Sequence, residues 1–162
     1  MLLLVPEISE RHFDLDYVDK AIDPSWIRLD AEGFHALHDR RMTESDSAWV
    51  IGKVIIRESR IGLLVLNSSP ECDHAVRYLT LTLFDGCSKQ PHWFSLIEND
   101  DHGGVYERSA FLVETNDTLV VSMNTGELGE WGVDTVFTRK DRIRLAPMVD
   151  TVSTETGFEI RR

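Results

Sequence analysis

Two cysteines and two histidines lie close enough in the sequence to suggest a metal site. One residue separates Cys72 from His74, and four residues separate Cys87 from His92. Zinc prefers thiolate and imidazole ligands, and two neighbouring hairpin loops would bring all four side chains to one end of a sheet. The spacing differs from that of known zinc knuckles. Half-buried thiols beside loop histidines are therefore the simpler interpretation, with zinc binding as the alternative.

The same residues also allow a nucleophilic cysteine. Cys72 or Cys87 would attack a substrate after losing its proton to His74 or His92. Reactive thiols normally lie at a helix N-terminus or beside a cation, because both stabilise the thiolate. Here the adjacent charge is acidic, since Asp73 follows Cys72 directly. This environment disfavours the thiolate, so we expect no catalytic cysteine.

Two further segments contain metal-binding residue types without the spacing of a known site. His35 and His38 share one face of a predicted helix but lack the four-residue spacing and the Glu of a metalloprotease helix. Residues 98–104 form an acidic turn that ends in two glycines, without the alternate-ligand register of a calcium loop. We expect surface histidines in the first segment and a solvated hairpin loop in the second.

Motifs of the common enzyme classes are absent from the sequence. The chain has no glycine-rich phosphate loop, no G-x-S-x-G nucleophile elbow and no dinucleotide-binding fingerprint. Each of these motifs holds a reacting group in a fixed backbone geometry, so their absence removes the usual sequence evidence for an enzyme. We therefore expect a non-catalytic protein that needs no cofactor.

Charge limits the kinds of partner. The 162 residues include 28 Asp and Glu against 17 Lys and Arg, which gives a formal net charge of −11. An acidic surface repels nucleic-acid backbones and anionic membranes, and it favours a basic or neutral protein partner. The apolar start of the chain ends at Pro6 and is too short to span a membrane or to form a signal-peptide core. Two cysteines make no disulfide framework, and we expect reduced thiols in a cytoplasmic protein.

Aromatic residues supply the remaining candidates for a binding surface. Trp93 and Trp131 lie in or near predicted loops, and the acidic residues Asp100 and Asp101 lie in another loop. Aromatic side chains bury large areas on binding, and acidic loops around them would attract a basic partner. We therefore predict a binding surface from these four residues, with burial in the core as the alternative for the tryptophans.

The N-terminal part of the chain favours short helices. Asp23 and Pro24 predict a helix that begins at the proline, and residues 30–41 predict a second helix with Phe34 and Leu37 on one face. After residue 47 the pattern changes to β-branched and aromatic runs separated by turn residues. These runs predict eight short strands, at residues 48–57, 60–67, 76–85, 91–97, 105–114, 118–124, 132–139 and 141–146.

The connections between these runs favour antiparallel pairing. None is long enough for the crossover helix that neighbouring parallel strands need. We therefore predict a mainly β fold of the α+β class, an antiparallel meander that forms either a sheet wrapped around the N-terminal helices or a barrel. A single domain is expected over residues 1–162, with a helical lead-in at 1–47, the meander at 48–146 and a loose tail or edge strand at 147–162.

Alternation of apolar and polar residues predicts which side chains face the core. Leu79, Leu81 and Leu83 point to one side of their strand, and we expect this side to be buried. Ile143 and Leu145 alternate with arginines in the same way. The arginines are expected to face water, as in a strand with one solvated side.

Length and strand number resemble those of lipocalin-like barrels, a likeness of architecture alone. The Gly-x-Trp motif near the first strand of that family has no counterpart here. Ser47 and Ala48 precede Trp49, and the sequence from Gly129 to Trp131 falls too late in the chain. Small size, acidity and the lack of catalytic motifs also resemble, in gross character, bacterial immunity proteins that neutralise a toxin.

These observations favour a non-catalytic, acidic protein-binding domain, with an immunity or inhibitor protein as its concrete form. The first alternative is a carrier that holds a small apolar molecule inside a β-barrel. The second alternative is a zinc-binding domain or zinc enzyme at the cysteines and histidines described above.

Overall fold

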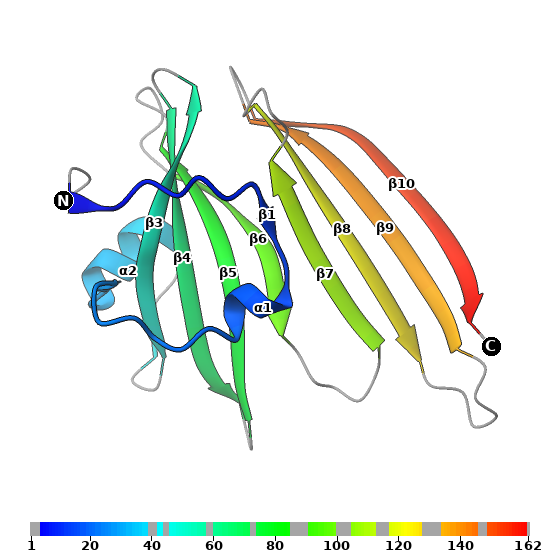
Figure 1. Ribbon diagram of the computed structural model, residues 1–162, viewed down its shortest axis with the longest axis horizontal. Coiled ribbons are helices and arrows are strands. Elements are labelled where there is room, and N and C mark those ends of the chain that lie inside the picture. Colours follow the sequence, from blue (N-terminus) through cyan, green and yellow to red (C-terminus); the bar gives the residue numbers. More distant parts are fainter. Residues whose placement is uncertain are drawn as a thin grey trace.

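Two antiparallel sheets of five strands each make up most of the protein (Figure 1). The computed structural model describes residues 4–38, 42–43, 46–57, 60–71, 74–84, 91–99, 105–112, 117–127, 134–145 and 149–161. Sheet A has the order β2 (Ile27–Arg28), β3 (Ser47–Arg57), β4 (Arg60–Glu71), β5 (His74–Phe84) and β6 (His92–Asn99). Sheet B has the order β1 (His12–Phe13), β7 (Val105–Leu112), β8 (Thr118–Glu127), β9 (Asp134–Arg144) and β10 (Asp150–Arg161).

The predicted antiparallel meander is confirmed, and it is divided between the two sheets. Each long strand pairs antiparallel with the next one along the chain, from β3 to β6 and again from β7 to β10. Strands β6 and β7 lie side by side, but none of the pairings between described strands joins them. The strands therefore form two sheets, where the sequence suggested one wrapped sheet or a barrel.

The last two predicted strands are wrong in their boundaries. We expected a turn at Lys140 and Asp141, but β9 runs through both residues and pairs with β8 and β10 at each of them. Aspartate favours turns, but here the Asp141 carboxylate accepts hydrogen bonds from Arg139 and Thr154 within the sheet, and charged side chains are tolerated in a strand whose faces reach water. The eighth long strand is instead the C-terminal tail, which forms the twelve residues of β10.

Of the two predicted N-terminal helices, the structure contains the second and lacks the first. Helix α2 (Ala31–His38) lies within its predicted range, and the Asp30 carboxylate caps it by accepting the Gly33 N–H at 2.8 Å. No helix begins at Pro24. The Asp23 carbonyl accepts the Trp26 N–H at 3.0 Å and closes a short turn that leads into β2. The first helix, α1 (Leu15–Val18), comes earlier in the chain.

Within the described residues, no helix is both long and apolar enough to cross a membrane.

Sheet A is covered on both faces. The predicted core side of β5 is confirmed, since Leu79, Leu81 and Leu83 are buried in a cluster that also takes Leu119 and Val121 from sheet B. The opposite face packs against α2. That second cluster joins Phe34 and Leu37 of the helix to strand residues Ala48, Val50, Leu63 and Val65. Burial of this amphipathic face stabilises a helix too short to be stable alone.

Residues 4–18 cross sheet A and reach sheet B (Figure 1). At β3 the Pro6 carbonyl accepts the Lys53 N–H at 2.8 Å, and the Ile8 N–H donates to the Lys53 carbonyl at 2.9 Å. Further along, β1 pairs with β7 and leaves the Phe13 side chain fully buried in the shared cluster. The segment therefore protects an edge of sheet A and joins the two sheets.

Two arginine side chains add polar links across the same junction. The buried Arg60 of β4 donates to the carbonyl of Leu145, which follows β9. Arg77 of β5 donates to the carbonyls of Val18 and Lys20 at the end of α1, at 3.3 and 3.4 Å. Each guanidinium thus binds carbonyl groups at or just after the end of a strand or a helix, where carbonyls lack the regular backbone partner.

Gly52 provides the space in which the crossing segment lies. A Cβ atom at this position would overlap the side chain of Ile8. We expect Gly52→Ala to destabilise the protein by about 1–3 kcal/mol, because an added methyl group in a packed site forces its neighbours to move. Urea unfolding measures the loss. In the double variant with Ile8→Ala, the space vacated by the isoleucine should make the total cost smaller than the sum of the two single costs. Additive costs would show that this contact does not constrain the segment.

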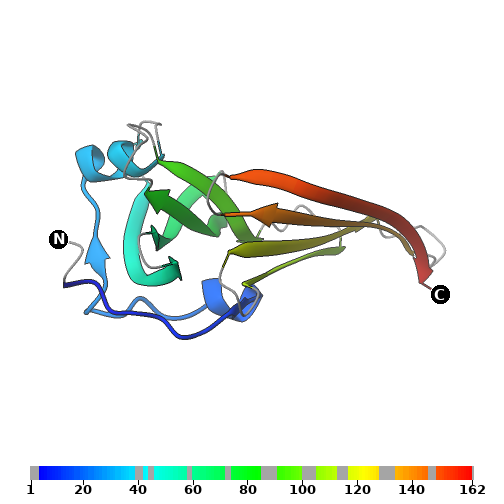
Figure 2. The same cartoon turned by 90° about the horizontal axis from the view of Figure 1, so that it is seen from above.

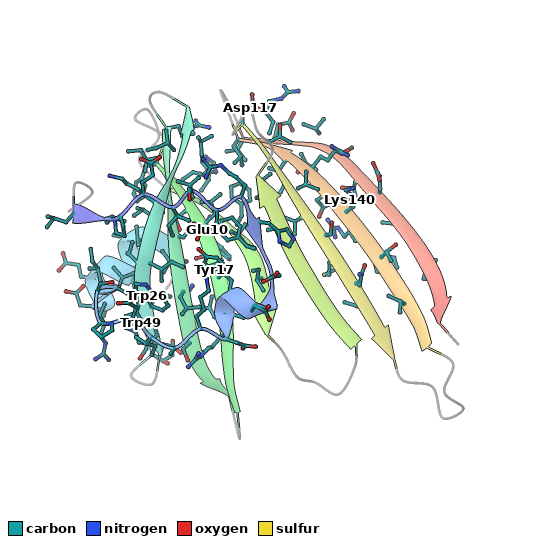
Figure 3. The ribbon with its side chains drawn as sticks, viewed as in Figure 1. Glu10, Tyr17, Trp26, Trp49, Asp117 and Lys140 are labelled. Atoms are coloured by element: carbon teal, nitrogen blue, oxygen red, sulfur yellow. The ribbon has the colours of Figure 1, made fainter. Side chains whose placement is uncertain are left out.

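Tyr17 of α1 lies over the junction beside Phe13 (Figure 3). The two rings meet edge to face at 5.1 Å, and the Lys20 ammonium lies 3.7 Å from the centre of the tyrosine ring. Burial, with a smaller contribution from the charge of Glu10, raises the pKa of Tyr17 from 10.0 to about 12. The folded state therefore holds this proton more tightly than the unfolded state does.

This shift predicts a specific loss of stability in alkali. Below a pH of about 10 the phenol is protonated in both states, and above it the unfolded chain begins to ionise first. We expect the free energy of unfolding of the wild type to fall, relative to that of Tyr17→Phe, as the pH rises from about 10 to about 12. Urea unfolding of both proteins across this range measures the difference. A difference that stays constant with pH would contradict the prediction.

Candidate functional site

The open edge of sheet B is formed by β10. This strand pairs with β9 over its whole length, and within the described part of the chain no strand pairs with its other side. Most of its described side chains are exposed. Figure 2 shows the long strands of sheet B extending away from sheet A, with the C-terminal end of β10 farthest from it. The edge therefore presents backbone N–H and C=O groups to any chain that approaches it.

Two large apolar side chains are exposed on the same strand. Phe158 is 78 % exposed, and Val152 is 50 % exposed at an irregularity in the pairing with β9. The Phe158 ring meets the ring of Phe137 across the strand pair at 5.3 Å in an edge-to-face arrangement. Exposed aromatic groups that a neighbour holds in place are typical of contact surfaces.

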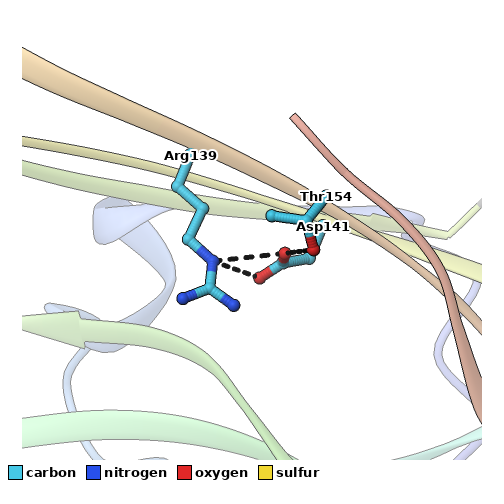
Figure 4. Close-up of polar contacts among 3 residues, drawn as sticks. All are labelled: Arg139, Asp141 and Thr154. Carbon is cyan, nitrogen blue, oxygen red and sulfur yellow. Dashed lines mark hydrogen bonds and ion pairs between the residues drawn. The ribbon is translucent and has the colours of Figure 1, made fainter. Parts of the chain in front are cut away.

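A polar network fastens β10 to β9 (Figure 4). The Arg139 Nε donates to both carboxylate oxygens of Asp141, at 2.9 and 3.2 Å, and the Thr154 hydroxyl donates to the same carboxylate at 2.7 Å. In register, Asp141 lies opposite Thr154 and Val121, so this network is on the face of sheet B that carries the core residues. We call this side the inner face.

The outer face of sheet B has a different character. Lys140 lies on it, opposite Ser122 on β8 and Glu155 on β10 (Figure 3 labels Lys140). The arginines predicted to face water, Arg142 and Arg144, are both exposed. Beside Lys140 is a hollow of about 330 Å³, which we call the Gly157 hollow; its lining includes Ser122, Asn124, Thr138, Lys140, Glu155 and Gly157.

One of the four predicted binding residues is in the described part of the chain. Trp93 lies on β6 of sheet A and is 46 % exposed, with its ring 6.0 Å from that of His38. Trp131, Asp100 and Asp101 lie outside the described residues. Trp93 lies on sheet A and the β10 edge belongs to sheet B, so Trp93 is not part of that edge. Because the other three residues lie outside the described part of the chain, a surface built from the four stays a prediction.

The predicted zinc ligands are only partly described. Cys72 and Cys87 lie outside the described residues, while His74 begins β5 and pairs in register with Glu71. The side chain of His92 is exposed at the start of β6. Among the residues that the structure describes, no group of three or more His, Cys, Asp or Glu side chains could hold a metal ion.

The histidine pair of α2 does not form a surface site. His38 is only 3 % exposed, and its Nε2 lies 3.0 Å from the hydroxyl oxygen of Thr80, whereas His35 is exposed. Asn67 donates to the same hydroxyl at 3.3 Å. The expectation of two surface histidines is therefore wrong for His38, which packs on Phe34 and completes a buried polar cluster under the helix.

Comparisons of this chain with protein-family models, curated proteins and solved structures gave no match. The candidate site therefore depends on the geometry of β9 and β10.

The sequence offered an edge strand as one of two alternatives for residues 147–162, and β10 is such a strand, but the predicted binding surface did not include it. The signal was present in the β-branched residues Thr151, Val152 and Thr154, followed by Phe158 and Ile160 at alternate positions. Only the strand order shows that this segment is the outermost strand of a sheet.

The network around Asp141 should control how firmly β10 is held. We expect Asp141→Ala to lower the free energy of unfolding by about 1 kcal/mol and to accelerate amide hydrogen exchange in β10, because two side chains lose their acceptor. The control is Asp150→Ala, which removes an exposed acidic group from the start of the same strand. Equal exchange rates in β10 for both variants would show that the network does not fasten this edge.

Proposed function

We propose that this chain is a non-catalytic protein-binding domain that binds an extended segment of its partner along the open edge of β10. The observation that supports the proposal most directly is the length of that edge, since β10 has twelve residues and most of its described side chains are exposed. An immunity or inhibitor protein is the concrete form of this function. In either form the binding energy comes from the backbone and a few side chains, without a reacting group.

Edges of this kind are normally protected. Proteins shorten an edge strand, cover it or place lysines on it, because a bare edge pairs with other chains. In sheet A the first edge is protected by β2 and by the pairing of residues 6–8 with Lys53. In sheet B, β1 lies against β7. Strand β6 also ends sheet A, but it has only eight residues and contacts β7. Among the described edge strands, β10 is thus the longest, which supports a role in strand addition.

The charge of the edge agrees with a basic or neutral partner. Strand β10 contains Asp150, Glu155 and Glu159 against Arg161, and the whole chain has a net charge of −11. A basic segment would be attracted to this edge, and a nucleic acid would be repelled by the protein as a whole. The role of the predicted loop residues Trp131, Asp100 and Asp101 in the same contact stays a prediction.

Lysine substitutions on the edge should weaken binding. We expect the double variant Val152→Lys with Phe158→Lys to lose at least about tenfold in affinity, because it removes apolar contacts and adds the charge that discourages strand pairing. Peptides selected from a random library on the wild type serve as the partner. Isothermal titration calorimetry gives the affinity, and hydrogen exchange shows which amides each peptide protects.

The control variant is Ile22→Lys, which places the same charge on another exposed apolar residue, 45 % exposed and outside both sheets. It should bind like the wild type. The proposal fails if the selected peptides protect segments other than β10, or if the double variant binds them as tightly as the control. A further variant, Trp93→Lys, tests whether the exposed tryptophan of sheet A contributes to the same contact.

A further inference from the structure

We propose that the Gly157 hollow receives a glutamine side chain of the partner segment, and so selects segments that carry a carboxamide at one register position. The inference depends on the proposed strand addition at β10, because that pairing brings the partner side chain to the hollow. It assigns a chemical preference to a binding edge whose backbone groups alone do not distinguish one sequence from another.

The hollow opens from the edge strand toward the middle of sheet B. In register, Gly157 lies opposite Thr138, and Thr138 lies opposite Asn124. The missing side chain at Gly157 leaves this row accessible from the β10 side, and a Cβ atom there would come within 3.0 Å of the Thr138 hydroxyl oxygen. A glycine inside a strand commonly marks a place where another group approaches closely.

Two opposite charges border the hollow. Lys140 and Glu155 lie directly opposite each other in the β9 and β10 register. They form no ion pair within 4.0 Å in the described structure, so both side chains keep hydrogen-bonding capacity for a third group. Arg139 also lines the hollow, but its Nε is bound to Asp141 on the inner face. Lys140 is the cation that lies directly opposite Glu155 in the register.

This pair of charges favours a neutral group with both a donor and an acceptor. A carboxylate would be attracted by Lys140 and repelled by Glu155, and an ammonium group would meet the reverse combination. A carboxamide satisfies both, since its oxygen accepts from the ammonium and its NH2 donates to the carboxylate. Hydrogen bonds to charged groups are among the stronger ones that proteins make.

The reach of the side chain selects glutamine over asparagine. Neighbouring strands lie about 4.8 Å apart, so a partner residue opposite Gly157 is separated from β9 by the width of two strand spacings. The longer glutamine side chain extends further across the glycine toward Lys140 and Glu155, whose own side chains border the hollow from the next pair in the register. The volume of about 330 Å³ accommodates this side chain together with water.

The test uses a peptide that protects β10 in hydrogen exchange. Each of its residues in turn is changed to Gln, Glu, Lys and Ala, and calorimetry gives the affinity of each form. We expect one position at which Gln binds about tenfold more tightly than the other three residues. Gly157→Val, which fills the hollow, should abolish this preference. Ser153→Val is the matched control, since it alters the same strand outside the lining of the hollow and should preserve the preference.

Charge variants test the same inference without filling the hollow. Lys140→Met leaves Glu155 alone and should shift the preferred residue from Gln to Lys, whereas Glu155→Gln should shift it toward Glu. If peptides protect β10 but no position prefers Gln, or if these variants leave the preference unchanged, the inference is overturned while the proposed function stands. If no peptide protects β10, both are overturned.

Discussion

The attachment of residues 4–18 across both sheets is the interaction on which the rest of the structure depends. Between described strands, no pairing joins β6 to β7, so the meander by itself leaves two separate sheets. The N-terminal segment pairs with Lys53 at one end and with β7 at the other, and it buries Phe13 among residues of both sheets. Arg60 and Arg77 add hydrogen bonds across the same junction. A shared core forms because this segment closes it.

Closure of the core is asymmetric, and the asymmetry creates the candidate site. Helix α2 covers one face of sheet A, and the N-terminal segment together with residues of sheet B covers the other, whereas the outer strands of sheet B extend past the core. Strand β10 is held by its ladder to β9 and by the Arg139, Asp141 and Thr154 network. It is therefore an ordered strand with an exposed side, which is the arrangement that strand addition requires.

The two faces of this outer strand pair carry different polar groups. On the inner face, the carboxylate of Asp141 is already engaged by Arg139 and Thr154, so these groups hold the strand in place. On the outer face, Lys140 and Glu155 border a hollow that Gly157 keeps open. Alternation along a strand makes this division possible, because consecutive side chains point to opposite sides.

The sequence by itself determined the features that depend on local periodicity. Alternation placed Leu79, Leu81 and Leu83 in the core and Arg142 in water, and short connections predicted antiparallel pairing; the structure confirms both. The same reasoning misplaced a turn at Lys140 and a helix at Pro24, because contacts with the surrounding chain override the local preferences there. Only the tertiary structure decided which strands share a sheet, whether His38 is buried and which strand is outermost in sheet B. These features depend on contacts between residues far apart in the chain, and period-two patterning carries no information about which strand lies next to which.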